Sequence, residues 1–381
     1  MFGFFNNKIF NYGWLPEYEG HEIYYQQMGN PNGEVVLTFH GGPGGHCKKS
    51  HGLYYDLKKY RVIMFDQRGC GKSKSEDLIA FNDTKRLIKD AKRLLEYLNI
   101  DEKIIVGGGS WGSTLALLFA QKYPELVKRI CINSVFLARR EDMEWMLKDS
   151  GLFYPDLLEE IRRQSEGENP YTHYAKLIFS EDLGSIQTAV KYMVHYEYLM
   201  GQLDAKFHEV KIDNEIINSA RISLYYAANR YFLEPDEILK NIDKIKDIPT
   251  LIVHNRLDMC CPLKGAWELY RSLNNAKIEI ISDIGHGGKN LKSTFKKLAY
   301  RVLFLIFKVF VIGGISINKA HTPCLFTSSL AYIRSTLTLT SSLFSYPINS
   351  GSNIFNVVSK SSKTAIPVTL RVVFFLSTTL T

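Results

Sequence analysis

Three residues whose side chains cooperate in nucleophilic catalysis occur in the order Ser110, Asp258 and His286. Ser110 is the centre of a Gly-x-Ser-x-Gly motif (residues 108–112) that stands between an apolar segment and a helical segment. In such a strand-to-helix turn the flanking glycines avoid collisions, and the serine hydroxyl is held out at the end of the sheet. A serine hydroxyl is too weakly acidic to react unaided, so a histidine must accept its proton and a carboxylate must orient that histidine. Ser110 is therefore the predicted nucleophile.

Asp258 and His286 are the predicted acid and base of the same site. Each follows an apolar segment typical of a buried strand, and the carboxyl ends of parallel strands meet at the edge of the sheet where Ser110 also emerges. The order serine, acid, histidine is the one that this architecture uses. Asp283 is the alternative acid, but it stands too close to His286 in the sequence for both to come from separate strand ends. His254 is the alternative base, but it precedes the acid and belongs to the strand itself.

An oxyanion hole is the remaining requirement of an acyl-transfer site, and two backbone N–H groups are predicted to form it. The residue after the nucleophile, Trp111, supplies one, and a loop after an early strand supplies the other. The glycine-rich segment HGGPGG at 40–45 is such a loop, and Pro43 stiffens it. We expect Gly42 to be the second donor, with Gly41 as the alternative. A glycine-rich turn without a catalytic role is the competing interpretation.

Two other motifs in this region resemble phosphate-binding loops. Glycines within 107–112 also spell Gly-x-Gly-x-x-Gly, but a dinucleotide site needs an acidic residue at the end of the next strand, and none occurs before Glu141. The segment DQRGCGKS at 66–73 ends like a P-loop, but Asp66 stands where the first glycine is required. Neither motif predicts a nucleotide site, and no cofactor or metal is expected.

Short apolar segments alternate with helical segments along the chain, which predicts an α/β fold. Segments rich in β-branched residues, typical of strands buried on both faces of a parallel sheet, occur at 35–40, 61–66, 103–108, 127–133, 249–255 and 276–282. Helical segments at 82–98 and 113–123 are long enough to connect parallel strands. Long amphipathic segments interrupt this alternation. We therefore predict a sheet in two parts, 1–138 and 241–304, with a helical cap inserted at 139–240.

The charge of the chain is unevenly distributed. There are 47 basic and 39 acidic residues, but every acidic residue lies at or before Asp283, and 11 basic residues lie after His286. Residues 1–286 therefore contain 36 basic and 39 acidic residues, a net charge of −3. A cationic face of the kind that binds nucleic acid is not expected on this part of the chain.

The cysteines and the terminal segments bear on location. Six cysteines without regular spacing indicate neither a disulfide framework nor a metal site, and they fit the cytoplasm. The first 14 residues lack the cationic start and apolar run of a signal peptide.

Residues 302–317 are apolar but contain Lys308 and fall short of the roughly 20 residues that cross a bilayer, so membrane association is not expected. Residues 321–381 contain 22 Ser or Thr, and we expect the tail at 305–381 to be poorly ordered.

Four motifs make the chain resemble the proline iminopeptidase family of α/β hydrolases over about residues 10–300: HGGPGG, DQRGCGKS, GGSWGSTLAL and HNRLDMCCP, in this order. The first and third motifs together distinguish this family from esterases that share only the serine motif. The resemblance implies an α/β-hydrolase sheet with a helical cap. It also implies a serine peptidase without a cofactor, whose substrates are peptides with a free N-terminus.

The resemblance also implies how the substrate's amino group is held, namely by acidic residues of the cap. One of them matches Glu197, in the segment AVKYMVHYE. The family's other acid aligns with Ser223, which has no negative charge to pair with an ammonium group. Either the specificity has changed or Glu197 suffices alone. Cys261 matches a family cysteine beside the catalytic aspartate, where a thiol reagent would block the site by its bulk.

The function predicted from the sequence is a serine aminopeptidase that releases an N-terminal proline, or a similar residue, through an acyl-enzyme. Ser110, Asp258 and His286 form the triad, and Trp111 and Gly42 receive the oxyanion. A hydrolase of small esters or amides that uses the same triad is the alternative within enzymes. A non-catalytic or membrane-associated interaction protein is the alternative from another class.

Overall fold

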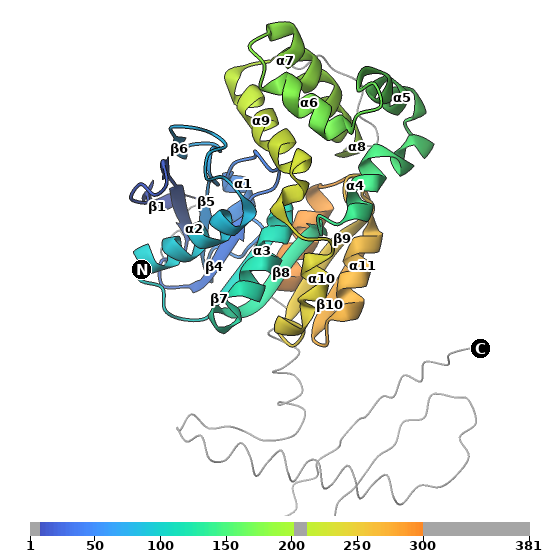
Figure 1. The fold of residues 1–381 in the computed structure, drawn as a ribbon. Helices are drawn as coiled ribbons and strands as arrows, with labels where there is room; N and C mark the ends of the chain where they lie inside the picture. The colour runs from blue at the N-terminus through green and yellow to red at the C-terminus, as the bar shows by residue number, and fades with distance from the viewer. Residues whose placement is uncertain (1–7, 202–211, 300–381) are drawn as a thin grey trace, which may run out of the picture. The chain divides into compact units, whose positions relative to one another are not determined.

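A computed structural model describes residues 8–201 and 212–299, apart from the side chains of residues 193–195 and 283–284 (Figure 1). The predicted tail at 305–381 and the apolar segment at 302–317 lie outside the described residues. Within the described part, no helix is long and apolar enough to cross a membrane.

An eight-stranded sheet forms the centre of the described residues, in the order β1-β3-β5-β4-β7-β8-β9-β10. The strands are β1 (Ile9–Trp14), β3 (Tyr24–Gly29), β5 (Tyr60–Phe65), β4 (Glu34–Phe39), β7 (Ile104–Ser110), β8 (Val127–Val135), β9 (Thr250–Leu257) and β10 (Ala276–Ile284). The six strands from β5 to β10 run parallel, whereas β1 and β3 pair antiparallel at one edge. Two short strands, β2 (His21–Glu22) and β6 (Lys74–Ser75), pair separately.

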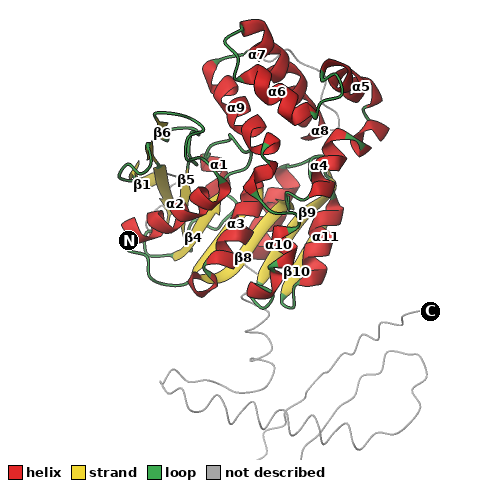
Figure 2. Ribbon diagram, viewed as in Figure 1, coloured by secondary structure: helices red, strands yellow, loops and turns green. Residues whose placement is uncertain are grey.

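Helices cover both faces of the sheet, because its strands are apolar on both faces (Figure 2). Along β4, for example, Val36 belongs to one hydrophobic cluster and Leu37 to the other, since successive side chains point to opposite faces. The covering helices and short connections are α1 (Lys49–Gly52), α2 (Thr84–Tyr97), α3 (Trp111–Lys122), α10 (Glu237–Lys240), α11 (Leu263–Ser272) and a helix over residues 289–299. The predicted fold class, an α/β-hydrolase sheet, is confirmed.

Seven α-helices among the described residues lie between β8 and β9 along the chain. The last is α10, and the six before it are α4 (Arg140–Leu147), α5 (Pro155–Gln164), α6 (Pro170–Ile178), α7 (Leu183–Ala189), α8 (His195–Gly201) and α9 (Asn214–Ala228). In Figure 1 the helices α5 to α9 lie together in a layer beyond one end of the sheet. This is the part of the chain in which a cap was expected, and it is called here the inserted helices.

The apolar pattern predicts the six parallel strands but misses β1 and β3. Both carry polar residues that interrupt the pattern, yet Gln26 and Gln27 are 3 % and 2 % exposed. Gln27 is paired across strands: its side-chain amide donates to Asn11 Oδ1 at 2.7 Å, and its oxygen accepts from Arg61 Nε at 2.7 Å. Such partners come from neighbouring strands, so these polar residues look like surface residues in the sequence.

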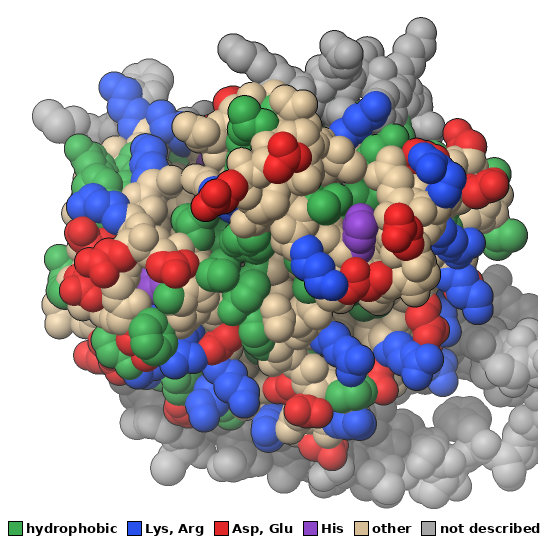
Figure 3. Space-filling model, turned by 45° about the horizontal axis from the view of Figure 1, so that its top comes forward, with side chains coloured by type: hydrophobic (Ala, Val, Ile, Leu, Met, Phe, Trp, Pro, Cys, Tyr) green, Lys and Arg blue, Asp and Glu red, His purple; other side chains and the backbone are tan. Residues whose placement is uncertain are grey.

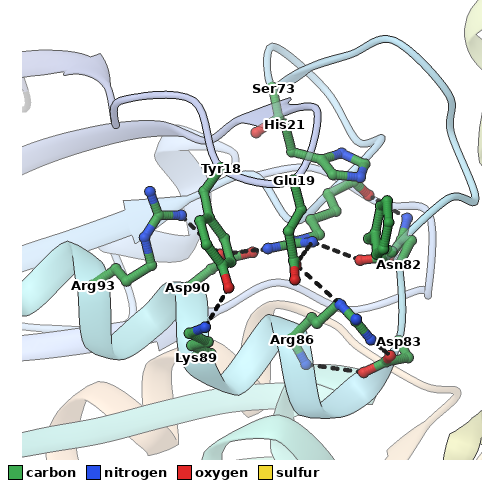
Figure 4. A network of polar contacts seen from close by, with 12 residues as sticks. Tyr18, Glu19, His21, Ser73, Asn82, Asp83, Arg86, Lys89, Asp90 and Arg93 are labelled. Carbon is green, nitrogen blue, oxygen red and sulfur yellow. Dashed lines mark hydrogen bonds and ion pairs between the residues drawn. The ribbon is translucent and has the colours of Figure 1, made fainter.

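A buried ion-pair network fastens α2 to the segment that follows β5 (Figure 4). The Arg68 side chain is fully buried; its Nε donates to Asp90 Oδ2 at 2.6 Å and its Nη2 donates to Asp90 Oδ1 at 3.0 Å. Arg68 Nη1 also donates to Glu19 Oε2 at 2.9 Å, and Arg86 Nε donates to the same oxygen at 3.0 Å. This network holds the residues on either side of Arg68 in place.

Replacing Asp90 with alanine should lower the free energy of unfolding by about 3–5 kcal/mol, because it leaves the Arg68 guanidinium buried without its bidentate partner. Denaturant unfolding followed by circular dichroism measures this loss. Glu22 is a matched control, since its ion pair with Lys74 is exposed, and Glu22→Ala should cost less than about 1 kcal/mol. Equal losses for the two variants would contradict a structural role for the buried pair.

Charged side chains of both signs are interspersed on the face shown in Figure 3, and hydrophobic side chains gather near its centre. Neither basic nor acidic side chains predominate on this face. The mixture agrees with the small net charge of residues 1–286.

Candidate active site

Ser110 lies at the junction of β7 and α3, with φ at 57° and ψ at −131°. A positive φ is uncommon for a residue with a side chain and marks a strained turn. A Cβ atom on Gly108 would collide with the backbone of Gly112, and one on Gly112 would collide with the carbonyl oxygen of Phe39. Glycine is therefore required on both sides of Ser110 for α3 to begin so close to the strands.

Asp258 and His286 are joined directly. His286 Nδ1 lies 3.0 Å from Asp258 Oδ1 and 2.9 Å from Oδ2. Asp258 is 2 % exposed, and its Oδ1 also accepts the backbone N–H of Cys261 at 2.9 Å. Because the carboxylate holds the proton on Nδ1, Nε2 of His286 is the nitrogen that can accept a proton.

The surroundings of His286 favour its protonated form. Burial by itself lowers the pKa of the imidazole, but the charge of Asp258, its hydrogen bond and the charge of Glu197 together raise it above its ordinary value. A base with a raised pKa accepts a proton more readily, and its acidic limit of activity lies at a higher pH.

The loop that carries His286 is held through its backbone. The side-chain amide of Asn255 donates to the carbonyl groups of both neighbours of His286, each at 2.8 Å. Ser134 Oγ donates to the carbonyl of His286 at 2.9 Å. The N–H of His286 donates at 2.9 Å to the carbonyl of Gly201, the last residue of α8. The inserted helices therefore contact the histidine directly.

One cavity of about 880 Å³ contains Ser110 and His286. The described residues include no hydrogen bond between these two side chains. Such contacts are often long without substrate.

Burial raises the pKa of the Cys261 thiol well above its ordinary value, and a hydrogen bond with the Ser110 side chain acts in the opposite direction. Residues from both the sheet and the inserted helices line the cavity, among them Phe39, Gly41, Gly42, Phe136, Met146, Tyr171, Glu197, Tyr231 and Cys261.

The two predicted oxyanion donors come from separate segments, α3 and the loop after β4. Trp111 is the first residue of α3, where a backbone N–H has no partner within the helix. The other side is the loop after β4: a Cβ on Gly41 would lie 3.4 Å from Ser110 Cβ and 3.9 Å from its Oγ. Gly42 also lines the cavity. Both Gly41 and Gly42 therefore remain available as the second donor.

Glu197 lies on α8 and lines the same cavity. Burial raises the pKa of its carboxyl group to about 7, against a lowering effect of the charge of His286. Among the described residues its carboxylate has no hydrogen bond or ion pair, and only its backbone carbonyl is engaged, by the Cys260 thiol at 3.3 Å. The side chain is partly shielded from water, and a carboxylate withdrawn from water without a partner is costly, so its position in the cavity needs a functional explanation.

Two tyrosines that line the cavity were not predicted from the sequence as residues of the site. Tyr171 and Tyr231 are 2 % and 7 % exposed, and within the described part neither hydroxyl has a hydrogen-bond partner. Burial raises the pKa of both phenols, and the charge of Glu197 raises it further, so both lie near that carboxylate. Tyrosines at helical spacing are usually core residues, and nothing in the sequence distinguishes these two.

The alternative base, His254, lies beside the predicted acid, with Nε2 3.8 Å from Asp258 Oδ2, but it is not among the residues that line the cavity. His254 is fully buried; its Nδ1 accepts the N–H of Val135 at 3.0 Å, and its Nε2 donates to the carbonyl of Cys261 at 2.8 Å. Both its nitrogens are thus engaged by the backbone. The side chain of Asp283 lies outside the described residues. Ser223, on α9, is not among the residues that line the cavity.

Comparison with known proteins gives two kinds of similarity. The family described as the alpha/beta hydrolase fold matches residues 34–289. The chain is 37 % identical to a probable proline iminopeptidase of Leptolyngbya boryana, over 72 % of this chain and 88 % of that protein. It is 35 % identical to a proline iminopeptidase of Arabidopsis thaliana, over 70 % of this chain and 72 % of that protein.

Solved structures share the fold at lower identity. A haloalkane dehalogenase variant from Bradyrhizobium elkanii matches with a TM-score of 0.53 at 14 % identity, over 80 % of this chain and 98 % of that one. A putative lipase from Acinetobacter baumannii matches with a TM-score of 0.50 at 20 % identity, over 79 % of this chain and 92 % of that one. These similarities concern the fold alone.

Proposed function

Because the chain belongs to the proline iminopeptidase family of α/β hydrolases, we propose that it releases an N-terminal proline from peptides through Ser110, Asp258 and His286. One observation carries the assignment. The partly buried carboxylate of Glu197, which has no partner among the described residues, lines the same cavity as Ser110 and His286. A site for a cationic amine therefore stands beside a site for acyl transfer.

The chemistry proceeds in two halves. Ser110 Oγ attacks the carbonyl carbon of the first residue while His286 Nε2 takes its proton, and the tetrahedral oxyanion is stabilised by the N–H groups of Trp111 and Gly42. The C–N bond then breaks as His286 returns the proton to the leaving amine. Water attacks the acyl-enzyme by the same route in reverse, which releases the amino acid. Asp258 orients His286 and stabilises its charge throughout.

Glu197 provides the contact that makes the enzyme an aminopeptidase. An ammonium group in the cavity would give the carboxylate a partner and offset part of the cost of its burial. Since Ser223 replaces the second family acid and does not line the cavity, Glu197 is the single acidic anchor in this proposal. The side chains of Tyr171 and Tyr231 line the same cavity, so either hydroxyl could accept the second N–H of the proline ammonium group.

The test is a proline arylamide offered beside its N-acetylated form. Cleavage of the free amine alone supports the aminopeptidase. Cleavage of both indicates a general hydrolase of small amides or esters, the second candidate, and cleavage of neither contradicts an enzymatic function. The Ser110→Ala variant shows whether any cleavage comes from a contaminating peptidase.

Glu197→Gln should raise KM for the free-amine substrate by about 10- to 100-fold, because an amide cannot pair with an ammonium group as a carboxylate does. The acetylated substrate should be little affected. The acidic limb of kcat/KM should also move to lower pH, because the charge of Glu197 raises the pKa of His286. Equal changes in KM for both substrates would mean that Glu197 supports the helix and not the amine.

The same variant should gain stability at alkaline pH. The pKa of Glu197 is about 7 in the folded protein, above its ordinary value of 4.5 in an unfolded chain. The free energy of unfolding of the wild type therefore falls as the pH rises from the ordinary pKa to the folded one. Glu197→Gln should therefore melt at a higher temperature than wild type at pH 8, and the difference should shrink at pH 5. A melting temperature that is lower at both pH values would contradict this view.

The proposal also covers the role of the inserted helices and the location of the protein. The inserted helices act as a cap, because α4, α6 and α8 each contribute residues to the cavity. The location is cytoplasmic, which fits the five unpaired cysteines among the described residues.

A further inference from the structure

Gln67 lies between the two halves of the oxyanion hole, in the segment between β5 and β6. Its side-chain Nε2 donates to the carbonyl of His40 at 2.9 Å, and its Oε1 accepts from Trp111 Nε1 at 3.0 Å. All three residues are at most 3 % exposed. One amide group therefore bridges the glycine-rich loop after β4 and the residue that follows the nucleophile.

A second pair of hydrogen bonds strengthens the bridge. The backbone N–H of Gln67 donates to His40 Nε2 at 3.0 Å, so the imidazole proton must sit on Nδ1, and Nδ1 donates to the carbonyl of Gly41 at 2.8 Å. Burial lowers the pKa of His40, which favours this neutral form. The carbonyl of Gly41 belongs to the peptide group whose N–H is that of Gly42. The chain of hydrogen bonds thus ends on one of the proposed oxyanion donors.

We propose that Gln67 is a positioning residue for acyl transfer, which fixes the distance between the Trp111 and Gly42 N–H groups by bonding to Trp111 and His40. The inference rests on the proposed function, because it concerns the same reaction. An oxyanion hole stabilises the transition state only when its donors already stand at hydrogen-bond distance from the developing charge. The two donors belong to separate segments, and Gln67 is placed to hold them in register. Its neighbour Arg68 is fixed by Asp90, which anchors this segment.

The test is Gln67→Met, which keeps the length of the side chain but removes both of its hydrogen bonds. We expect kcat for the proline arylamide to fall about 10- to 100-fold while KM changes less than about threefold, since the donors serve the transition state. A proline-derived boronic acid, which forms a tetrahedral adduct with serine, should bind more weakly by the same factor. Free proline, which is not tetrahedral, should bind equally well.

Gln121→Met is the matched control. Gln121 is buried on α3 and donates to the carbonyl of Ile238 at 2.7 Å, so its loss also removes a buried hydrogen bond. This variant should lose stability but keep kcat. A kcat for Gln67→Met within twofold of wild type, or an equal loss in Gln121→Met, would overturn the proposal.

The variant Trp111→Phe and labelling of Ser110 by a fluorophosphonate test the proposal where Gln67→Met does not fold or the arylamide is not cleaved. Trp111→Phe removes the indole N–H at the other end of the bridge, along with part of the buried ring, so it should also lower kcat, and its effect should not add to that of Gln67→Met. It replaces Gln67→Met if that variant does not fold, and an unchanged kcat would then overturn the inference. If the wild-type protein does not cleave the arylamide, the proposed function fails. The rate at which a fluorophosphonate labels Ser110 then tests Gln67, because that reaction needs the same donors.

Discussion

Replacing Ser110 with alanine should reduce kcat for a proline arylamide by about 10⁴- to 10⁶-fold, the range seen when a triad nucleophile is removed. The hydroxyl oxygen is the only non-hydrogen atom lost, and it is the atom that bonds to the substrate in the acyl-enzyme. Alanine can occupy the same strained turn, because the glycines at 108 and 112, and not the serine side chain, relieve its close contacts. The variant should therefore fold as wild type does.

Steady-state kinetics and labelling by a fluorophosphonate measure this loss independently. Ser165→Ala is a suitable control, because Ser165 is buried in the inserted helices and bonds to the carbonyl of Ile161. It should keep full activity. Activity of Ser110→Ala within tenfold of wild type would rule out Ser110 as the nucleophile.

Replacing Asp258 with asparagine should lower kcat by about 10⁴-fold, as in other triads in which the acid becomes an amide. Both carboxylate oxygens of Asp258 lie within 3.0 Å of His286 Nδ1. An amide that turns its N–H toward the imidazole would stabilise the wrong tautomer, with the proton on Nε2. Loss of the charge should also lower the pKa of His286, so the remaining activity should extend to lower pH.

Asp283→Asn is the matched control, since Asp283 is the competing acid in the sequence. It should leave kcat within about twofold of wild type. A large loss in Asp283→Asn together with a small one in Asp258→Asn would exchange the two roles. The pH profile distinguishes a lost orienting acid from a merely destabilised loop, because only the former moves the pKa of His286.

Helix α8 carries Glu197 and also contacts the backbone of His286. Glu197 lies one helical turn before Gly201, whose carbonyl accepts the N–H of His286 at 2.9 Å. A substrate amine held by Glu197 would therefore act on the same helix that holds the catalytic histidine. If the proposed function holds, changes in the inserted helices are therefore expected to affect kcat as well as KM.

The sequence alone establishes the fold class, the family and the order of the predicted triad. Buried parallel strands have a local signature, since they must be apolar on both faces, and the turn at Ser110 requires glycine at fixed spacing. These features depend on neighbours in the chain. They can therefore be recognised without knowing what lies across the cavity.

Only the tertiary structure shows which polar groups meet. Gln67 is 44 residues from Trp111 and 27 from His40, so nothing local distinguishes its bridging amide from an ordinary loop glutamine. Tyr171 and Tyr231 look like core tyrosines until the fold brings them to the cavity that Glu197 also lines. Hydrogen bonds and burial depend on distances between segments that are remote in the sequence. For this reason the chemistry of the cavity, unlike the elements that build it, follows from the fold.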